Sequence, residues 1–280
     1  MKQWRLIIDV EKCENCNNCF LACKDEHCGN DWPGYAAPQP LHGHRWMNIL
    51  RKERGQFPFV DAAYLPKPCY HCDAAPCMAA VPDGTIYRRP DGIVLIDPDK
   101  AAGRREIADV CPHGAIWWNA ERSVAQKCTF CAHLLDAGWK APRCAQACPT
   151  GALRAVHDED AEMDRRIESL NLEMPESPRG PVSGRVHYRN LYRFHRAFIA
   201  GTAATGRDAV PECAAGAVLA LSRNGEIIDR QTADAFGDFK FDGLPLRGGD
   251  YAIEIVHSGF PNRTLRVQLE DSLSLGTIWL

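Results

Sequence analysis

Four cysteines near the start of the chain stand at a spacing that suits iron–sulfur chemistry. Cys13, Cys16, Cys19 and Cys23 follow the pattern C-x2-C-x2-C-x3-C. In this pattern three thiolates bind one [4Fe–4S] cluster, and the fourth binds a neighbouring cluster. A zinc site needs only two close pairs and a loop, and disulfides between such near neighbours would be strained. The spacing therefore favours a redox-active cluster over a zinc site or disulfides.

Further cysteine groups and an internal repeat extend this pattern. The signature CPHGAI, which begins at Cys111, recurs as CPTGAL from Cys148, and it recurs once more as VPDGTI from Val81. Such a repeat indicates a duplicated ferredoxin-like unit, in which Gly84, Gly114 and Gly151 are expected to be turn residues. The remaining groups, in chain order, are Cys69, Cys72 and Cys77; Cys111 alone; and Cys128, Cys131, Cys144 and Cys148.

One copy of the repeat has lost its ligands. Counting back from Cys111 by the motif spacing reaches Ile107, Arg104 and Ala101 instead of cysteines. In a duplicated ferredoxin each cluster takes three ligands from one motif and the fourth from its partner, so these positions and Val81 would have held the same cluster. The sequence predicts that this cluster is absent. We expect apolar packing in its space, with Arg104 turned toward solvent or an acidic partner.

Twelve of the fourteen cysteines divide into three predicted cluster sets of four. We expect three [4Fe–4S] clusters and no catalytic residue in this chain. Cys28 and Cys213 fall outside the sets, and we expect Cys28 to be buried and unliganded. The first set is Cys13, Cys16, Cys19 and Cys148; the second is Cys23, Cys128, Cys131 and Cys144; the third is Cys69, Cys72, Cys77 and Cys111.

The elements that position these sets indicate an α+β protein of two domains. The chain has 280 residues, which is long for one domain. Thirteen of its fourteen cysteines lie in the predicted iron–sulfur domain, residues 1–157. Residues 196–280 show alternating apolar and polar segments between Gly, Pro and Asp turns, with a hairpin turn at Asn224 and Gly225. This part predicts a small antiparallel β-sandwich or barrel.

Residues 158–195 are predicted to connect the two domains. Asp158–Asn171 has the apolar spacing of a short helix, with Asp158 as its N-cap. Residues 173–184 are rich in proline and charge, which is typical of a linker.

Composition excludes two classes of partner. A net charge of −3 and a sequence pI of about 6.4 do not suit nucleic-acid binding. No apolar stretch is long enough for a membrane span, and the first ten residues do not resemble a signal peptide. We expect a cytoplasmic protein, unless a signal on a partner chain directs export.

The tryptophans of the N-terminal half predict a protein interface. They are Trp32, Trp46, Trp117, Trp118 and Trp139.

Residues 1–157 resemble the ferredoxin-type iron–sulfur subunits of the dimethyl sulfoxide reductase family of molybdopterin enzymes. The resemblance rests on the cysteine motifs, on residues 92–97 (GIVLID) and on residues 126–133 (QKCTFCAH). Residues 43–48 (GHRWMN) and 188–194 (YRNLYRF), together with the lost cluster, are similar to the small subunits of transhydroxylases and hydroxylases of phenolic compounds. The C-terminal part resembles transthyretin-like or carboxypeptidase-regulatory modules.

The resemblance implies an electron-transfer subunit without catalytic residues. Its partner would be a large subunit that holds molybdenum or tungsten on bis-molybdopterin guanine dinucleotide and that hydroxylates or transhydroxylates a phenolic ring. A hydroxylase would pass electrons through this chain to an external acceptor. The alternatives are a subunit of another molybdopterin oxidoreductase, a subunit whose clusters serve structure without net electron flow, a free ferredoxin-like carrier and an assembly protein.

Overall fold

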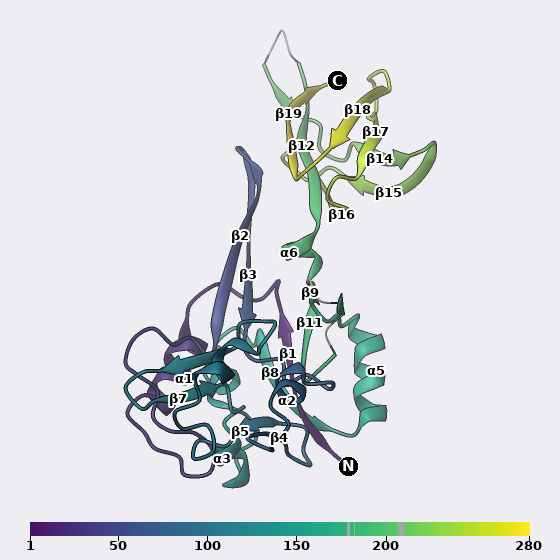
Figure 1. Ribbon diagram of the computed structural model, residues 1–280. Helices are drawn as coiled ribbons and strands as arrows, with labels where there is room; N and C mark the ends of the chain where they lie inside the picture. Colours follow the sequence, from purple (N-terminus) through teal and green to yellow (C-terminus); the bar gives the residue numbers. More distant parts are fainter. Residues whose placement is uncertain (178–179, 182, 207–209) are drawn as a thin grey trace. The chain divides into compact units, whose positions relative to one another are not determined.

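The computed structural model describes residues 1–177, 180–181, 183–206 and 210–280. The chain forms two compact units, traced in Figure 1. The first unit comprises residues 1–50 and 64–191, and the second comprises residues 51–63 and 192–280. Each unit has buried apolar clusters of its own.

The first unit consists of short elements joined by long loops. The hairpin β2 (Asn48–Gln56) and β3 (Phe59–Lys67) starts and ends in this unit, and its outer part belongs to the second. The other elements are β1 (Gln3–Asp9), α1 (Asn18–His27), α2 (Pro76–Ala80), β4 (Ile86–Arg88), β5 (Val94–Ile96), the 3₁₀ helix η1 (Arg105–Asp109), β6 (Ile116–Asn119), β7 (Val124–Lys127), α3 (Ala132–Asp136), α4 (Arg143–Gln146), β8 (Leu153–Asp158), α5 (Asp160–Leu170), β9 (Glu176–Ser177), β10 (Gly180–Pro181) and β11 (Val186–Arg189).

Strand β1 is the centre of a three-stranded sheet. It pairs antiparallel with β8 and parallel with β11. Neighbours on both edges satisfy its backbone hydrogen bonds, and its apolar residues Leu6 and Ile8 are buried. Helix α5 packs Met163 against Ile7 of the same strand. The first cysteine motif therefore begins where a fully paired strand ends, which fixes the position of the cysteine loop.

Helix α5 agrees with the helix predicted in residues 158–195, but the end of this range is part of a sheet instead of a linker. Strand β11 lies within that range, yet it is part of the first unit's sheet. Asp158 ends β8, so the N-cap of α5 is Glu159. The sequence around β11 gives no clear strand signal, and its pairing with β1, far away in sequence, is what places it in the sheet.

The glycines of the repeated signature act as predicted. Gly84, Gly114 and Gly151 have φ of 77°, 64° and 65°, a left-handed conformation that suits glycine. Each is followed two residues later by the start of a strand, at β4, β6 and β8 respectively. The glycine thus turns the chain out of each cysteine segment and into a strand.

The second unit is a β-domain built from two four-stranded sheets. One has the order β13-β12-β16, with β19 also paired to β12, and the other has the order β15-β14-β17-β18. Phe239 and Ile199 from the first sheet share one buried core with Leu219 and Ile253 from the second. Its elements are α6 (Tyr192–His195), β12 (Ala197–Thr205), β13 (Glu212–Cys213), β14 (Val218–Arg223), β15 (Glu226–Thr232), β16 (Asp238–Leu244), β17 (Gly249–Val256), β18 (Arg263–Leu269) and β19 (Leu273–Trp279).

Two features of this β-domain differ from the prediction. The arrangement is not wholly antiparallel, because β19 runs parallel to β12. In addition, the tip of the β2–β3 hairpin belongs to this unit. The guanidinium of Arg54 in the hairpin is fully buried and donates hydrogen bonds to Asp61, to Asp242 and to the carbonyl oxygen of Arg196. These long-range contacts give the hairpin tip its place in the unit.

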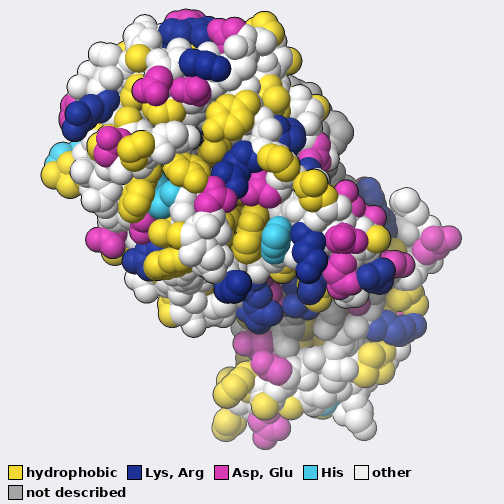
Figure 2. All heavy atoms as spheres, turned by 90° about the horizontal axis from the view of Figure 1, so that it is seen from below, with side chains coloured by type: hydrophobic (Ala, Val, Ile, Leu, Met, Phe, Trp, Pro, Cys, Tyr) yellow, Lys and Arg dark blue, Asp and Glu magenta, His cyan; other side chains and the backbone are white. Residues whose placement is uncertain are grey.

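On the face shown in Figure 2, basic and acidic side chains are interspersed, with hydrophobic side chains between them. No helix in the described part of the chain combines the length and the apolar character of a membrane span.

Candidate metal centres

The first predicted set lies where the loop after β1 meets the end of α4. Cys19 is on α1, and Cys148 lies just beyond α4. Burial raises the pKa of Cys19 to about 12, and the neighbouring sulfurs of Cys13, Cys148 and Cys16 contribute to the rise. The backbone N–H of Leu153 donates to Cys148 Sγ at 3.4 Å. The structure thus brings together four thiols from opposite ends of the first unit.

The second set is the most deeply placed. Cys23 lies on α1. Cys128 precedes α3, Cys131 is the N-cap of α3, and Cys144 lies on α4. Burial raises the pKa of Cys131 to about 12 and that of Cys128 to about 11. Burial also holds the pKa of Cys144 well above its usual range, and the sulfurs of the other three members add to this effect.

The third set surrounds an enclosed cavity. Cys69 and Cys72 come from the loop after β3, Cys77 from α2, and Cys111 from the segment after η1. Burial raises the pKa of Cys72 to about 12, with the other three sulfurs adding to the rise. The N–H of Ala115 donates to Cys111 Sγ at 3.4 Å. All four sulfur-bearing residues line the same cavity.

The three sets follow one another in space. Helix α1, which carries Cys19 of the first set, contacts α4, which carries Cys144 of the second set. The backbone of Cys69 in the third set forms a hydrogen bond with the thiol of Cys128 in the second set. The second set therefore lies between the other two, an order that sequence alone does not supply.

The donor chemistry fits iron–sulfur clusters. All fourteen cysteines are free thiols. In the described residues, no three His, Cys, Asp or Glu side chains lie close enough together to hold a single metal ion. Four thiols around a wider space suit an iron–sulfur cluster with several iron atoms. Burial keeps these thiols protonated, and bound metal would deprotonate them.

Orphaned polar atoms beside the sulfurs give an independent indication of a missing group. His71 is buried and lines the third-set cavity. Its Nδ1 accepts a hydrogen bond from the backbone N–H of Val94 at 3.1 Å, and its Nε2 has no partner. Burial holds the pKa of His71 well below its usual range, so the ring is neutral with Nε2 as donor. A cluster sulfur would supply the acceptor that the protein lacks.

The position of the lost cluster is filled by protein, as predicted. Val81, Ala101 and Ile107 are buried together in one apolar cluster. Arg104 turns away from it and donates to Asp83 at 2.6 Å and to Glu106 at 3.0 Å. None of these side chains offers a thiolate, so this space is structural.

The predicted interface tryptophans differ in exposure, and the prediction for Cys28 needs correction. Trp46 is buried, and Trp32 stacks on His133 at 4.0 Å between ring centroids. Of the five predicted interface tryptophans, Trp139 is 41% exposed and Trp32, Trp117 and Trp118 are partly exposed, so the interface stays a prediction. Cys28 is partly exposed rather than buried.

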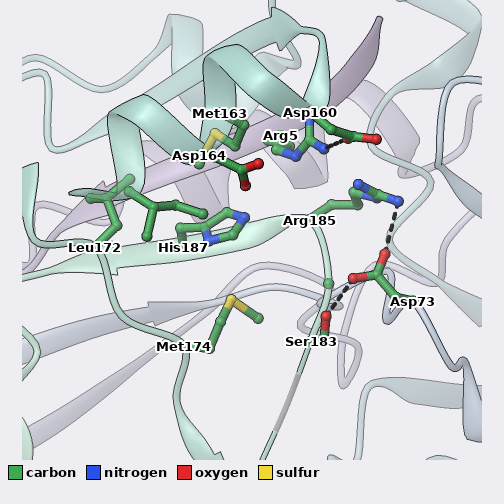
Figure 3. Close-up of a pocket in the computed structure, with 12 residues that line it drawn as sticks. Arg5, Asp73, Asp160, Met163, Asp164, Leu172, Met174, Ser183, Arg185 and His187 are labelled. Atoms are coloured by element: carbon green, nitrogen blue, oxygen red, sulfur yellow. Dashed lines mark hydrogen bonds and ion pairs between the residues drawn. The ribbon is translucent and has the colours of Figure 1, made fainter. Parts of the chain in front are cut away.

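Sequence reasoning missed a cavity of about 470 Å³ between α5 and β11, because it depends on the unexpected strand. Figure 3 shows Arg5 directed to Asp160 and Arg185 directed to Asp73. Burial lowers the pKa of His187 in its wall to about 4. The cavity contains no cysteine, and its arginines are neutralised by its own aspartates, so it is separate from the metal centres.

Comparison with known proteins agrees with this geometry. The 4Fe-4S dicluster domain family matches residues 60–158. The small subunit of pyrogallol hydroxytransferase from Pelobacter acidigallici is 44% identical over 100% of both chains. A sulfite dehydrogenase subunit from Allochromatium vinosum is 35% identical over 60% of this chain and 75% of its own length. The iron–sulfur subunit of arsenate respiratory reductase from Shewanella is 28% identical over 65% and 94%, respectively.

Proposed function

Because this chain belongs to the iron–sulfur electron-transfer subunits of molybdopterin oxidoreductases, the family that includes the small subunit of pyrogallol hydroxytransferase, we propose that it holds three [4Fe–4S] clusters in a line. The sets of four thiols would bind them, with the second cluster in the middle. The observation that carries the proposal is that each outer set adjoins the second set. Helix α1, which carries Cys19, contacts α4, which carries Cys144, and the backbone of Cys69 forms a hydrogen bond with the thiol of Cys128.

The residues of this chain would position the clusters and exclude water from them. When bound, the clusters supply one-electron redox chemistry. Backbone N–H groups directed at cysteine sulfurs, as at Phe130 to Cys128 Sγ (3.4 Å), stabilise thiolate charge. His27 Nε2 lies 3.8 Å from Cys131 Sγ and is buried, which adds a side-chain donor at the second set. No residue of the chain is assigned a catalytic role.

The partner would be a large catalytic subunit in a heterodimer. Full-length similarity to the small subunit of pyrogallol hydroxytransferase supports such a partner. Its site would hold bis-molybdopterin guanine dinucleotide with molybdenum or tungsten, and its substrate would be a phenolic aromatic. If the reaction is a hydroxylation, electrons would leave through the clusters to an external acceptor. If it is a transhydroxylation, there is no net redox change, and the clusters would poise the metal site.

The C-terminal region, residues 196–280, would be a transthyretin-like module. Two four-stranded sheets around one apolar core support this assignment. We assign it no ligand.

Crossed ligation provides the decisive experiment. Cys148→Ala should damage the cluster of Cys13, Cys16 and Cys19, although Cys148 is near Cys144 in sequence. Electron paramagnetic resonance should show its loss or its conversion to a three-iron form. The unmodified chain, purified with its large subunit, should contain about twelve irons in the small subunit. About eight or about sixteen irons would refute the three-cluster assignment, and an intact first-cluster signal in Cys148→Ala would refute the crossed set.

A further inference from the structure

Lys127 is a buried lysine between two of the cluster sets. It is the last residue of β7, is only 3% exposed and directly precedes Cys128 of the second set. Its side chain also lines the cavity enclosed by the third set. The ammonium donates hydrogen bonds to the carbonyl oxygens of Val94 and Cys128. One side chain thus contacts the surroundings of both sets.

No carboxylate of the described residues forms an ion pair with Lys127. Two carbonyl oxygens satisfy hydrogen bonds but carry no net charge, and an ammonium buried without a counter-charge is strongly destabilising. Burial raises the pKa of the Cys77 and Cys128 thiols, and Lys127 opposes this rise at both sulfurs. The negative charge that balances Lys127 is therefore on the sulfur side, in the second and third sets.

We propose that Lys127 is a positioning residue that raises the reduction potentials of the second and third clusters and leaves that of the first nearly unchanged. The proposal rests on the proposed function, because it needs clusters in these sets. A cluster held by four thiolates is anionic and gains one more negative charge on reduction. A fixed cation in a low-dielectric site favours the reduced form. Since it lies at the junction of two sets, Lys127 acts on both.

The consequence is a step in potential along the line of clusters. A cation shared by the second and third clusters shifts both reduction potentials in one direction and changes the difference between them little. It changes the difference between their potentials and that of the first cluster much more. Lys127 would therefore favour the residence of an electron on the second and third clusters over the first.

Redox titration of the purified complex, followed by electron paramagnetic resonance, tests this. Lys127→Met removes the charge at similar length, and Lys127→Gln keeps a hydrogen-bond donor. Each should make reduction of the second and third clusters about tenfold less favourable, which is about 59 mV for a one-electron couple. The first cluster should not move and serves as an internal reference. Lys100→Met is the matched control, because Lys100 is an exposed lysine of the same unit, and it should leave all three potentials unchanged.

Unchanged potentials of the second and third clusters in both variants would overturn the proposal. An equal shift of all three clusters would also overturn it, because a local charge cannot act equally on the distant first set. If both variants lose iron, Lys127→Arg decides: wild-type potentials in that variant support the charge, and displaced potentials refute it. Failure of the proposed function would look different, because the unmodified complex would then lack reducible four-iron clusters altogether.

Discussion

Each unit contains a buried cation close to its functional or structural centre, Arg54 in the second unit and Lys127 in the first, and their surroundings differ. In the second unit, Arg54 is fully buried and contacts the carboxylates of Asp61 and Asp242, with Lys240 and Arg193 close to the same acids. In the first unit, Lys127 has only carbonyl oxygens as hydrogen-bond partners in the described structure. The second unit therefore balances Arg54 with its own carboxylates, whereas the proposed clusters would balance Lys127 in the first unit.

This difference indicates two sources of stability. The second unit has a continuous apolar core between two sheets, which is the usual basis of independent folding. The first unit arranges short elements around buried thiols, and removal of their metal would leave polar groups without partners. The predictions below test this contrast, from the largest expected effect to the smallest.

Iron removal should have the largest effect and should act on one unit only. Treatment of the full chain with a chelator under oxidising conditions should unfold the first unit, because metal binding and folding are coupled there. Hydrogen exchange should then show lost protection in β1 and β8 and retained protection in β14 and β17. Simultaneous loss of protection in both units would show that the second unit is not self-sufficient.

Arg54→Met should be the most damaging single change in the second unit. It leaves Asp61 and Asp242 without their buried partner, and loss of one member of a buried ion pair costs about 3–5 kcal/mol. We expect the lower end, because Lys240 and Arg193 still contact Asp61. Denaturant unfolding of the β-domain signal measures the effect.

Arg51→Met is the matched control for Arg54→Met. Arg51 lies in the same hairpin, but it pairs with Glu53 at the exposed surface. Surface pairs contribute at most about 1 kcal/mol, so the free energy of unfolding should change little. Equal effects of the two variants would contradict the role assigned to burial.

Acid should weaken the second unit through the same acids. Burial alone would raise the pKa of Asp61, but hydrogen bonds from Arg54 and Arg193 outweigh it and lower the pKa from 3.8 to about 2. A carboxyl whose pKa is depressed by folding stabilises the fold above its unfolded pKa, and this stability is lost as the pH falls from about 4 toward about 2. The expected loss is ~2 kcal/mol.

The acid dependence can be checked by thermal unfolding between about pH 5 and about pH 2, values chosen to bracket these pKa values. In Asp61→Asn the slope of stability against pH should be smaller than in the unmodified protein. An unaltered slope would assign the acid sensitivity to other carboxyl groups.

The smallest effect is expected at the two cysteines outside the sets. Cys28 is partly exposed and Cys213 is exposed on β13 of the second unit. Cys28→Ser and Cys213→Ser should leave iron content and all cluster signals unchanged. A changed signal in either variant would mean that the division of the cysteines into three sets is wrong.

Much of the candidate site could be predicted from the sequence because cysteine spacing is a local property of the chain. The motif at Cys13 and the repeated signatures at Cys111 and Cys148 identify candidate ligands before any fold is known. The repeat also predicted that one cluster is lost, and the apolar packing of Val81 and Ile107 agrees with the packing expected in its space.

What the sequence could not reveal depends on contacts between distant segments. Arg54 lies in a polar strand segment that reads as solvent-exposed, yet its carboxylate partner Asp242 is 188 residues away. Nothing in the sequence around Lys127, which precedes the predicted ligand Cys128, indicates that its side chain is buried. Likewise, β11 is a strand only because it pairs with β1. The residue types and spacings of this chain determined by themselves which thiols can bind iron. The tertiary structure decided the order of the sets and which cations are buried, because burial arises from segments that the chain brings together only on folding.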